Sequence, residues 1–408
     1  MAFALLALHW RPIRAESWRP RADDSFSLDS FQDDNVAQIE KAALGGDPKA
    51  QYKLGAMYLR GKAVEQDDAL ALRWLTKSAE QGYAPAQNRL GAMYRGGFSV
   101  SRDDAAAKRW FLKSGEQGFA EAQRNLGIIY AEGSPGDFSA ARRWYEKAAA
   151  QGDAESEYQL GLLSLGGRGG KPNRVEAKSW YAKAAETGHI EAQHALAELL
   201  EEDGSYEAAL ILFSKAASRG HVPAQARLAE IYEDGRGAPK SAVEAWDWWR
   251  KAAEGSDARA QYRVGQAYQN GLFGIAKDPT LALDWYARAA KQGEGRSAYA
   301  LGLMYRSGEG TTPDQEAARD WIQKAAARGL PEAQNALGLM YASGEGGVPA
   351  DKVKACAWLI LASEQGYGVD REALDELKAQ LTGAELGQLI EEMRHDRTPG
   401  QAVKFARP

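Results

Sequence analysis

The groups best suited to chemistry in this chain are a glycine-rich basic loop, five histidines and one cysteine. The loop, residues 166–173, has the glycines and lysine of a phosphate-binding loop, but it contains Pro172 and follows no predicted strand. His189 and His221 recur one repeat apart, and packed helices lie roughly 10 Å apart, too far to share a metal ion. Cys356 has no catalytic frame around it. We therefore expect no enzyme activity, catalytic residue, cofactor or metal site.

Composition excludes several other classes of protein. The chain of 408 residues has 51 Lys and Arg against 56 Asp and Glu, whereas a general nucleic-acid binder needs a basic excess. Charged residues make up 26% and no apolar run approaches ~18 residues, so no transmembrane segment is predicted. One cysteine excludes an internal disulfide framework and a cysteine-based zinc site.

Residues 1–34 are predicted to lie outside the folded region. Met1 to Leu8 are apolar without a preceding basic segment, so they suit either the remnant of a signal peptide or a disordered tail. Residues 17–34 are rich in Asp and Ser and show no periodicity. Both an exported or periplasmic and a cytoplasmic location remain open, with a slight preference for export.

From Asp47 onward the sequence repeats itself in nine copies of 32 to 37 residues. The copies begin at Asp47, Tyr83, Phe119, Asp153, His189, His221, Asp257, Glu294 and Leu330, and the last ends at Gly366. An incomplete unit from Asn35 supplies one leading helix. We thus expect a repeat domain over residues 35–366, followed by capping helices and a tail over 367–408. Thr382 and Glu385 are expected to form a capping box at the start of the last helix.

Each copy begins with a predicted amphipathic helix that ends at a glycine. In the second copy its apolar stripe is Ala86, Leu90, Met93 and Tyr94, and Gly91 lies beside Leu90. Glycine inside a helix costs about 1 kcal/mol relative to alanine, so its recurrence at this position indicates close approach of a neighbouring helix. Glycines at the end of this helix are expected to adopt the left-handed conformation. They are Gly61, Gly97, Gly133, Gly167, Gly235, Gly271, Gly308 and Gly344.

A second predicted helix in each copy carries a tryptophan flanked by small residues. The positions are Trp74, Trp110, Trp144, Trp180, Leu212, Trp248, Trp285, Trp321 and Trp358. This regular spacing favours core packing over a ligand site, so Trp144→Ala is predicted to cost about 3–5 kcal/mol. Lysines three residues later are interpreted as cations placed near a helix C-terminus. They are Lys77, Lys113, Lys147, Lys183, Lys215, Lys251 and Lys324.

These features together resemble the Sel-1-like repeat, a relative of the tetratricopeptide repeat. In the first copy Lys49 to Tyr58 read KAQYKLGAMY, and Ala71 to Ala79 read ALRWLTKSA. The match covers residues 35–366. The resemblance implies an all-α, right-handed α/α superhelical solenoid of helix-turn-helix repeats. It also implies a concave side lined by the first helices, where a partner protein or peptide binds in an envelope, signalling or regulatory assembly of a bacterium.

Two copies depart from the pattern. The fifth copy has 32 residues, lacks the long loop and has Leu212 in place of the tryptophan. The fourth has Ser164 where tyrosine is usual and the glycine-rich loop described above. We expect a bend or a softer joint between Gly166 and Gly204.

The candidate partner-binding residues lie on the first helices, off their apolar stripe. Copies one to three offer cations, copy four apolar groups, and copies five and six carboxylates, which would suit a partner segment with an acidic end, an apolar anchor and a basic end. Trp246 is added because it lies outside the tryptophan frame. The candidates are Arg89, Arg95, Arg124, Tyr158, Leu162, Leu165, Glu198, Glu201, Glu230, Glu233 and Trp246. Chance clustering of surface charges is the alternative interpretation.

We therefore predict a non-catalytic scaffold or adaptor that is an elongated monomer. The alternative is a carbohydrate or cell-wall binding module whose aromatic rings stack on sugars. Its candidates share one helix slot and are Tyr52, Tyr158, Tyr262 and Tyr299. A hydrolase would require a base and a nucleophile that the sequence does not present.

Overall fold

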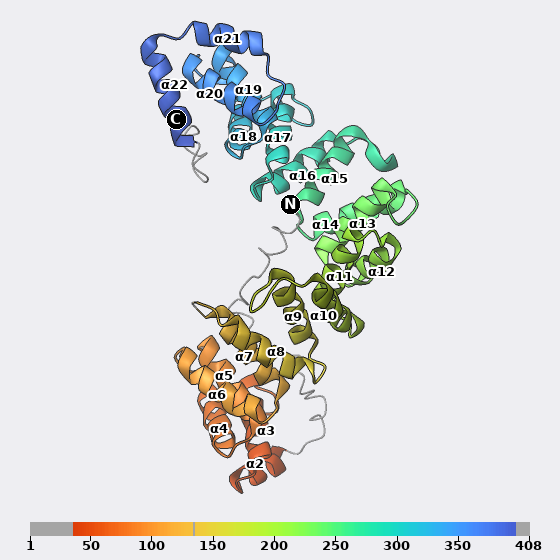
Figure 1. Cartoon of the computed structure of the whole chain (residues 1–408), viewed down its shortest axis with the longest axis vertical. Coiled ribbons are helices and arrows are strands. Elements are labelled where there is room, and N and C mark those ends of the chain that lie inside the picture. The colour runs from red at the N-terminus through yellow and green to blue at the C-terminus, as the bar shows by residue number, and fades with distance from the viewer. Residues whose placement is uncertain (1–35, 134, 397–408) are drawn as a thin grey trace. The chain divides into compact units, whose positions relative to one another are not determined.

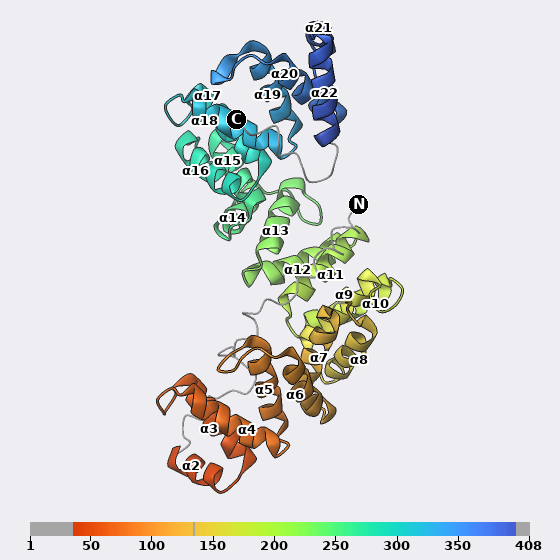
Figure 2. The ribbon, with the colours of Figure 1, turned by 90° about the vertical axis from the view of Figure 1, so that its left-hand side faces the viewer.

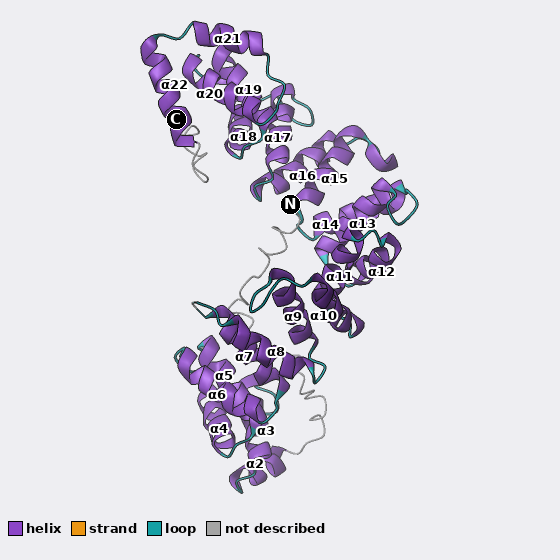
Figure 3. Cartoon of the chain, viewed as in Figure 1, coloured by secondary structure: helices purple, strands orange, loops and turns teal. Residues whose placement is uncertain are grey.

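The computed structural model describes residues 36–133 and 135–396, which form helices and connecting loops without any strand (Figure 3). The expected all-α solenoid of helix pairs is confirmed. The predicted tail over residues 1–34 lies outside the described residues, as does the chain beyond Asp396.

Nine helix pairs follow one another along the chain (Figure 1). The first helices are α3 (Pro48–Arg60), α5 (Ala84–Gly96), α7 (Ala120–Glu132), α9 (Ala154–Gly166), α11 (Ile190–Glu202), α13 (Val222–Asp234), α15 (Ala258–Asn270), α17 (Gly295–Ser307) and α19 (Pro331–Ser343). The second helices are α4 (Asp68–Glu80), α6 (Asp104–Glu116), α8 (Phe138–Ala149), α10 (Arg174–Glu186), α12 (Tyr206–Ser218), α14 (Ala242–Glu254), α16 (Pro279–Lys291), α18 (Gln315–Ala327) and α20 (Lys352–Glu364). Helix α2 (Val36–Leu44) precedes them, and α21 (Arg371–Ala379) and α22 (Gly383–Asp396) follow.

The chain divides into two compact units, residues 1–203 and 204–408. Within each unit, successive helices pack on their neighbours along the chain, as the two views in Figures 1 and 2 show. The division falls in the short turn between α11 and α12, which belongs to the fifth copy, the one without a long loop. The joint expected between Gly166 and Gly204 stays a prediction.

Polar side chains define where most helices begin. Eight of the nine second helices start at an Asp, Asn or Ser whose side chain accepts a hydrogen bond from the first turn. His189 and His221 do the same for α11 and α13, through Nδ1. The slot that these histidines occupy is therefore the N-cap of the first helix, which gives them a local structural role.

Seven of the eight predicted terminal glycines are left-handed, with φ between 61° and 79°. The expectation is wrong for Gly133, whose φ is −54° and ψ is 153°. The connection from Gly133 to Asp137 is two residues shorter than the equivalent one from Gly97 to Asp103. The chain therefore leaves α7 in an extended conformation, without a left-handed cap.

The residue after each tryptophan, rather than the tryptophan itself, occupies the centre of the core. The prediction that these tryptophans form the core is corrected, because all of them except Trp358 are only partly buried. The following residue is at most 4% exposed in every copy. These residues are Leu75, Phe111, Tyr145, Tyr181, Phe213, Trp249, Tyr286, Ile322 and Leu359. Successive side chains on a helix point about 100° apart, which is enough to bury the residue after the tryptophan and to leave the tryptophan itself partly exposed.

The helical glycines face these buried side chains, which confirms the close approach predicted for them. A Cβ atom added at Gly91 would lie 2.7 Å from Cδ1 of Phe111, and one added at Gly265 would lie 2.7 Å from Cδ1 of Tyr286. Real Cβ atoms essentially never approach other atoms so closely. The glycine therefore makes room for the large side chain of the second helix.

The partly buried tryptophans carry a cation on one ring face. Six lysines three residues downstream lie 4.0–4.6 Å from the ring centroid. Those lysines are Lys77, Lys113, Lys147, Lys183, Lys251 and Lys324. Cation–π attraction thus contributes to their placement, beyond the helix dipole expected from the sequence. Lys215 is the exception, because Leu212 offers it no ring.

Helices α21 and α22 cover the last repeat. Leu374, Leu381 and Leu389 belong to the same buried cluster as Trp358, which is 1% exposed. The predicted capping box is confirmed: Thr382 N donates to Glu385 Oε2 at 2.7 Å, and Glu385 N donates to Thr382 Oγ1 at 3.3 Å. These helices hide the apolar face that a stacked array leaves at its end.

Candidate functional site

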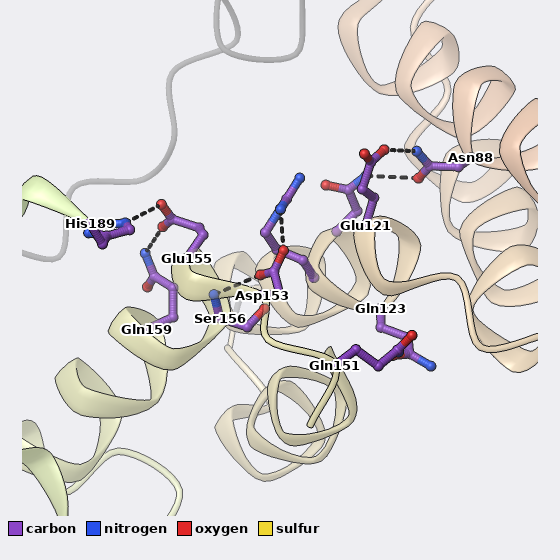
Figure 4. A network of polar contacts seen from close by, with 11 residues as sticks. Asn88, Glu121, Gln123, Gln151, Asp153, Glu155, Ser156, Gln159 and His189 are labelled. Atoms are coloured by element: carbon purple, nitrogen blue, oxygen red, sulfur yellow. Dashed lines mark hydrogen bonds and ion pairs between the residues drawn. The ribbon is translucent and has the colours of Figure 1, made fainter. Parts of the chain in front are cut away.

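The first helices of copies two to five are linked by polar contacts that run from one repeat to the next. Asn88 on α5 donates to Glu121 on α7 and accepts from Asn125, also on α7 (Figure 4). Glu155 on α9 then bonds His189 at the start of α11 (Figure 4). We call the side formed by the first helices the first-helix face. Its polar groups hold successive repeats in register.

The predicted cations of copies two and three take part in these contacts. Arg95 is paired with Asp104 at 2.9 Å and also with Glu132. Arg124 is paired with Asp153, the N-cap of α9. Arg89 is 7% exposed. The carboxylates of neighbouring elements therefore offset much of the positive charge that the sequence places here.

The apolar group of copy four is mostly covered. Tyr158 stacks on His189 with ring centroids 4.9 Å apart and lies 5.7 Å from Tyr181. Burial, with the nearby carboxylates of Glu155 and Glu191, raises the pKa of Tyr158. Leu165 is 9% exposed, whereas Leu162 is partly exposed on the first-helix face.

The carboxylates of copies five and six are also engaged. Glu198 lies 3.7 Å from Nδ1 of His194, one turn away. In the second unit, Glu230 is paired with Arg227 and Arg259, and Glu233 is paired with Arg263. Glu233 also accepts a hydrogen bond from Nε1 of Trp249 at 3.0 Å. Glu201 is partly exposed.

Arg259 and Arg263 are charged residues of a first helix in the second unit that reasoning from the sequence missed. They belong to α15, and their partners Glu230 and Glu233 lie about one repeat earlier. Arg95 and Glu132 are also about one repeat apart, but here the carboxylate lies in the later repeat. Opposite charges spaced one repeat apart on first helices were therefore the signal available in the sequence.

Trp246 is packed inside the second unit. Its ring lies 5.5 Å from that of Tyr268 in an edge contact and 6.3 Å from that of Phe273 in a stacked one. Phe273 belongs to the short helix η3 (Leu272–Gly274) of the next repeat. The ring is therefore partly buried against the neighbouring repeat rather than free in solvent.

The tyrosines considered for sugar stacking are also packed between helices. Tyr52 is 9% exposed and meets Tyr83 edge-on, with ring centroids 5.5 Å apart. Tyr262 lies 5.7 Å from Tyr286. Tyr299 is partly buried, and burial raises its pKa. Sugar binding requires exposed ring faces, and these side chains offer little of them.

Glu155 and His189 form a hydrogen-bonded carboxylate–imidazole pair in this network, a combination that acid–base catalysis can use. Ala192 N donates to Nδ1 at 3.2 Å, so the proton lies on Nε2, which donates to Glu155 Oε2 at 3.1 Å. Burial alone would raise the pKa of Glu155, but hydrogen bonds from His189 and Gln159 outweigh it and keep the pKa below its usual value. Both ring nitrogens are thus occupied within the protein, an arrangement that suits helix capping better than proton transfer to a substrate.

A second polar ladder joins most of the first helices to the helix that precedes them. In seven copies a buried glutamine donates through Nε2 to the carbonyl eight residues earlier, at 3.0–3.3 Å. These residues are Gln51, Gln87, Gln123, Gln193, Gln225, Gln261 and Gln334. Copy four has Glu157 instead, which is 7% exposed and has an oxygen without a hydrogen-bond partner. Burial raises the pKa of Glu157.

Among residues 36–133 and 135–396, no group of three or more His, Cys, Asp or Glu is arranged to hold a metal ion. In the same ranges, none of the helices has the length and apolar character needed to cross a membrane. Cys356 is buried, and burial raises the pKa of its thiol.

The helix pairs, the glycine–ring contacts and the ladders between repeats define a tetratricopeptide-like α-solenoid. The family model described as Sel1 repeat matches nine consecutive segments, and the chain belongs to the Sel1 repeat family. The segments are residues 48–83, 84–119, 120–153, 154–189, 190–221, 222–257, 258–294, 295–330 and 331–367. Each begins one residue after a copy boundary deduced from the sequence, so the predicted family and repeat number are confirmed.

Individual relatives add context. A putative sel1-like repeat-containing protein of Acanthamoeba polyphaga mimivirus is 46% identical over 43 residues, 10% of this chain and 7% of that protein. One similar solved structure is a protective antigen present in uropathogenic Escherichia coli strains, which has an SLR fold and is 28% identical. The comparison covers 91% of this chain and 95% of that chain, with a TM-score of 0.45. A Sel1 repeat protein from Oxalobacter formigenes is 28% identical, covers 92% and 99%, and has a TM-score of 0.38. Proteins with Sel1 repeats typically mediate protein–protein interactions and are generally non-catalytic.

Proposed function

We propose that this chain is a non-catalytic scaffold that binds an extended segment of a partner protein along the first-helix face. The observation that carries the proposal is the row of polar contacts from Asn88 to His189, in which the pair of Arg124 and Asp153 joins α7 to the start of α9, so that four consecutive first helices are linked. A surface that is rigid before binding loses less conformational entropy when a partner binds.

The contacts of the candidate residues support some of them over others as partner contacts. The arginines Arg95 and Arg124 already bind carboxylates of this chain, so a partner meets a mixed, mostly neutralised surface. Leu162 is partly exposed beside that network and supplies an apolar contact. We therefore place the centre of binding at copy four and give the charges a role in orientation rather than in affinity.

Photo-crosslinking tests this proposal directly. Benzoylphenylalanine in place of Leu162 is expected to crosslink a specific protein from the source cells. The same group in place of Ile211, which is 57% exposed on a second helix, is expected not to capture that protein. Capture from Ile211 alone would show that the partner binds elsewhere.

The captured partner then allows an affinity measurement. Leu162→Asp is expected to weaken binding by about tenfold or more, because it places a charge in an apolar contact. Leu339→Asp changes the equivalent position of copy nine, where the leucine is 52% exposed, and is the matched control. Equal affinity of both variants and the wild type would contradict a site centred on copy four.

A further inference from the structure

A cleft of about 930 Å³ lies beside the second helices of the last two repeats. Its wall is formed by α18, by the loop after α19 and by the start of α20. Four cationic side chains line it, Arg319, Lys324, Arg328 and Lys354, together with the ring of Tyr341. The cleft lies within the second unit and is separate from the first-helix face of copies two to five.

The same place in repeats six and seven is filled by aromatic side chains. The loops 271–278 and 344–351 have equal length, and each contains a short helix, η3 and η4 (Glu345–Gly347), that contacts the preceding second helix. The middle residue of each has a positive φ, 56° at Phe273 and 72° at Gly346. In the loop 271–278, Phe273 packs on Trp246. In the last two repeats, Gly346 stands at the position equivalent to Phe273, and Arg319 at the position equivalent to Trp246. The ring that closes the earlier site is thus missing from the later one.

The cations of the cleft are unequally neutralised. Arg319 is hydrogen-bonded to Asp320 and to the carbonyl of Gly347, and Lys354 lies 3.6 Å from Asp351. Lys324 lies over Trp321, and Arg328 is exposed. Within the described ranges, neither Lys324 nor Arg328 forms an ion pair with a carboxylate. With Asp320 and Asp351 counted, the lining keeps an excess of two positive charges.

We propose that this cleft binds an acidic, extended segment of a partner protein that inserts one aromatic side chain. The ring takes the place that Phe273 fills in repeat seven and packs against Tyr341 and the stem of Arg319. Carboxylates on either side of it pair with Lys324 and Arg328. The proposal rests on this cleft alone and holds whether or not the first-helix face binds a partner.

The probe is a fluorescein-labelled peptide, Glu-Asp-Phe-Glu-Asp, titrated with the full chain and followed by fluorescence anisotropy. We expect saturable binding that weakens with added salt, and weaker binding of the peptide in which alanine replaces phenylalanine. Lys324→Glu and Arg328→Glu are each expected to weaken binding about tenfold. Lys251→Glu is the matched control, because Lys251 lies over Trp248 in the same way beside the filled site.

Filling the cleft provides a test that does not depend on reversing a charge. Gly346→Phe recreates the ring of repeat seven, and the Cβ atom there meets the flexible methyl tip of Met340 rather than backbone. It is expected to abolish peptide binding while the helical circular dichroism stays unchanged. Arg319→Trp, which recreates Trp246, is the second variant if the first fails to fold. Three outcomes would overturn the proposal. One is equal binding of the two peptides, and another is an equal weakening of binding by Lys251→Glu and Lys324→Glu. The third is full peptide binding by a folded Gly346→Phe or Arg319→Trp variant.

Discussion

The glycine beside each first-helix leucine has a packing role that its helix propensity alone would not predict. Alanine in place of an exposed helical glycine usually adds about 1 kcal/mol of stability. At Gly91 the added Cβ atom would lie 2.7 Å from the buried ring of Phe111, which is enclosed on all sides. The ring has no room to withdraw, since it is fully buried.

We therefore expect Gly91→Ala to destabilise the fold, by about 1–3 kcal/mol as an overpacked core. Gly387→Ala is the matched control, because Gly387 lies in α22 with no atom within 4 Å of the added Cβ, and it should stabilise by up to about 1 kcal/mol. Urea denaturation followed by circular dichroism measures both. An increase in stability for Gly91→Ala would contradict the close approach.

At the scale of one element, α9 carries two carboxyl groups, the partly buried Glu155 and the buried Glu157, whose pKa values shift in opposite directions. Glu155 accepts from His189 and Gln159, and its pKa is lowered. Glu157 replaces the glutamine of other copies, and burial raises its pKa. A lowered pKa gives stability that is present above the unfolded value and lost as the pH falls through the folded one. A raised pKa gives stability that is present below the unfolded value and lost as the pH rises through the folded one.

The two glutamine variants should therefore have opposite pH profiles. At neutral pH, Glu157→Gln is expected to be more stable than the wild type by about 1 kcal/mol, because the amide can donate to the carbonyl as in the other repeats. Glu155→Gln is expected to be less stable by a similar or smaller amount. The Glu157 difference should shrink as the pH falls to about 4, where this carboxyl group becomes protonated in both states. The Glu155 difference should shrink only at lower pH, as the pH falls from the unfolded pKa through the lowered folded pKa. Thermal midpoints across this pH range measure them, and differences of the same sign at neutral pH would contradict the assignment.

At the scale of the whole molecule, each repeat depends on its neighbours for burial. Helices within each unit contact mainly those before and after them in sequence, so stability is transmitted locally and an end repeat needs a cover. Helices α21 and α22 supply that cover over Trp358, which is 1% exposed. Without them, the large apolar side chain of Trp358 on α20 would lose part of its cover.

A chain ending at Gly366 is accordingly expected to lose stability and to self-associate. A chain ending at Asp396 retains both helices and should behave as the full chain does. Size-exclusion chromatography with light scattering, together with thermal denaturation, compares the two. If the shorter chain stays monomeric and equally stable, then α21 and α22 do not act as a cap.

The sequence by itself determined the repeat, the family and the helix pairs, because glycine, alanine and tryptophan recur at fixed spacing. It also predicted the close approach at Gly91 and the capping box of Thr382 and Glu385, since both depend on local geometry. Only the tertiary structure decided which residue fills the core, because Trp110 and Phe111 are equally apolar and a rotation of about 100° separates them. It alone showed that Arg95 binds Glu132 and that Trp246 packs on Phe273, because these contacts join different repeats. Whether a charge or a ring is free to meet a partner depends on such neighbours, and spacing within one repeat does not specify them.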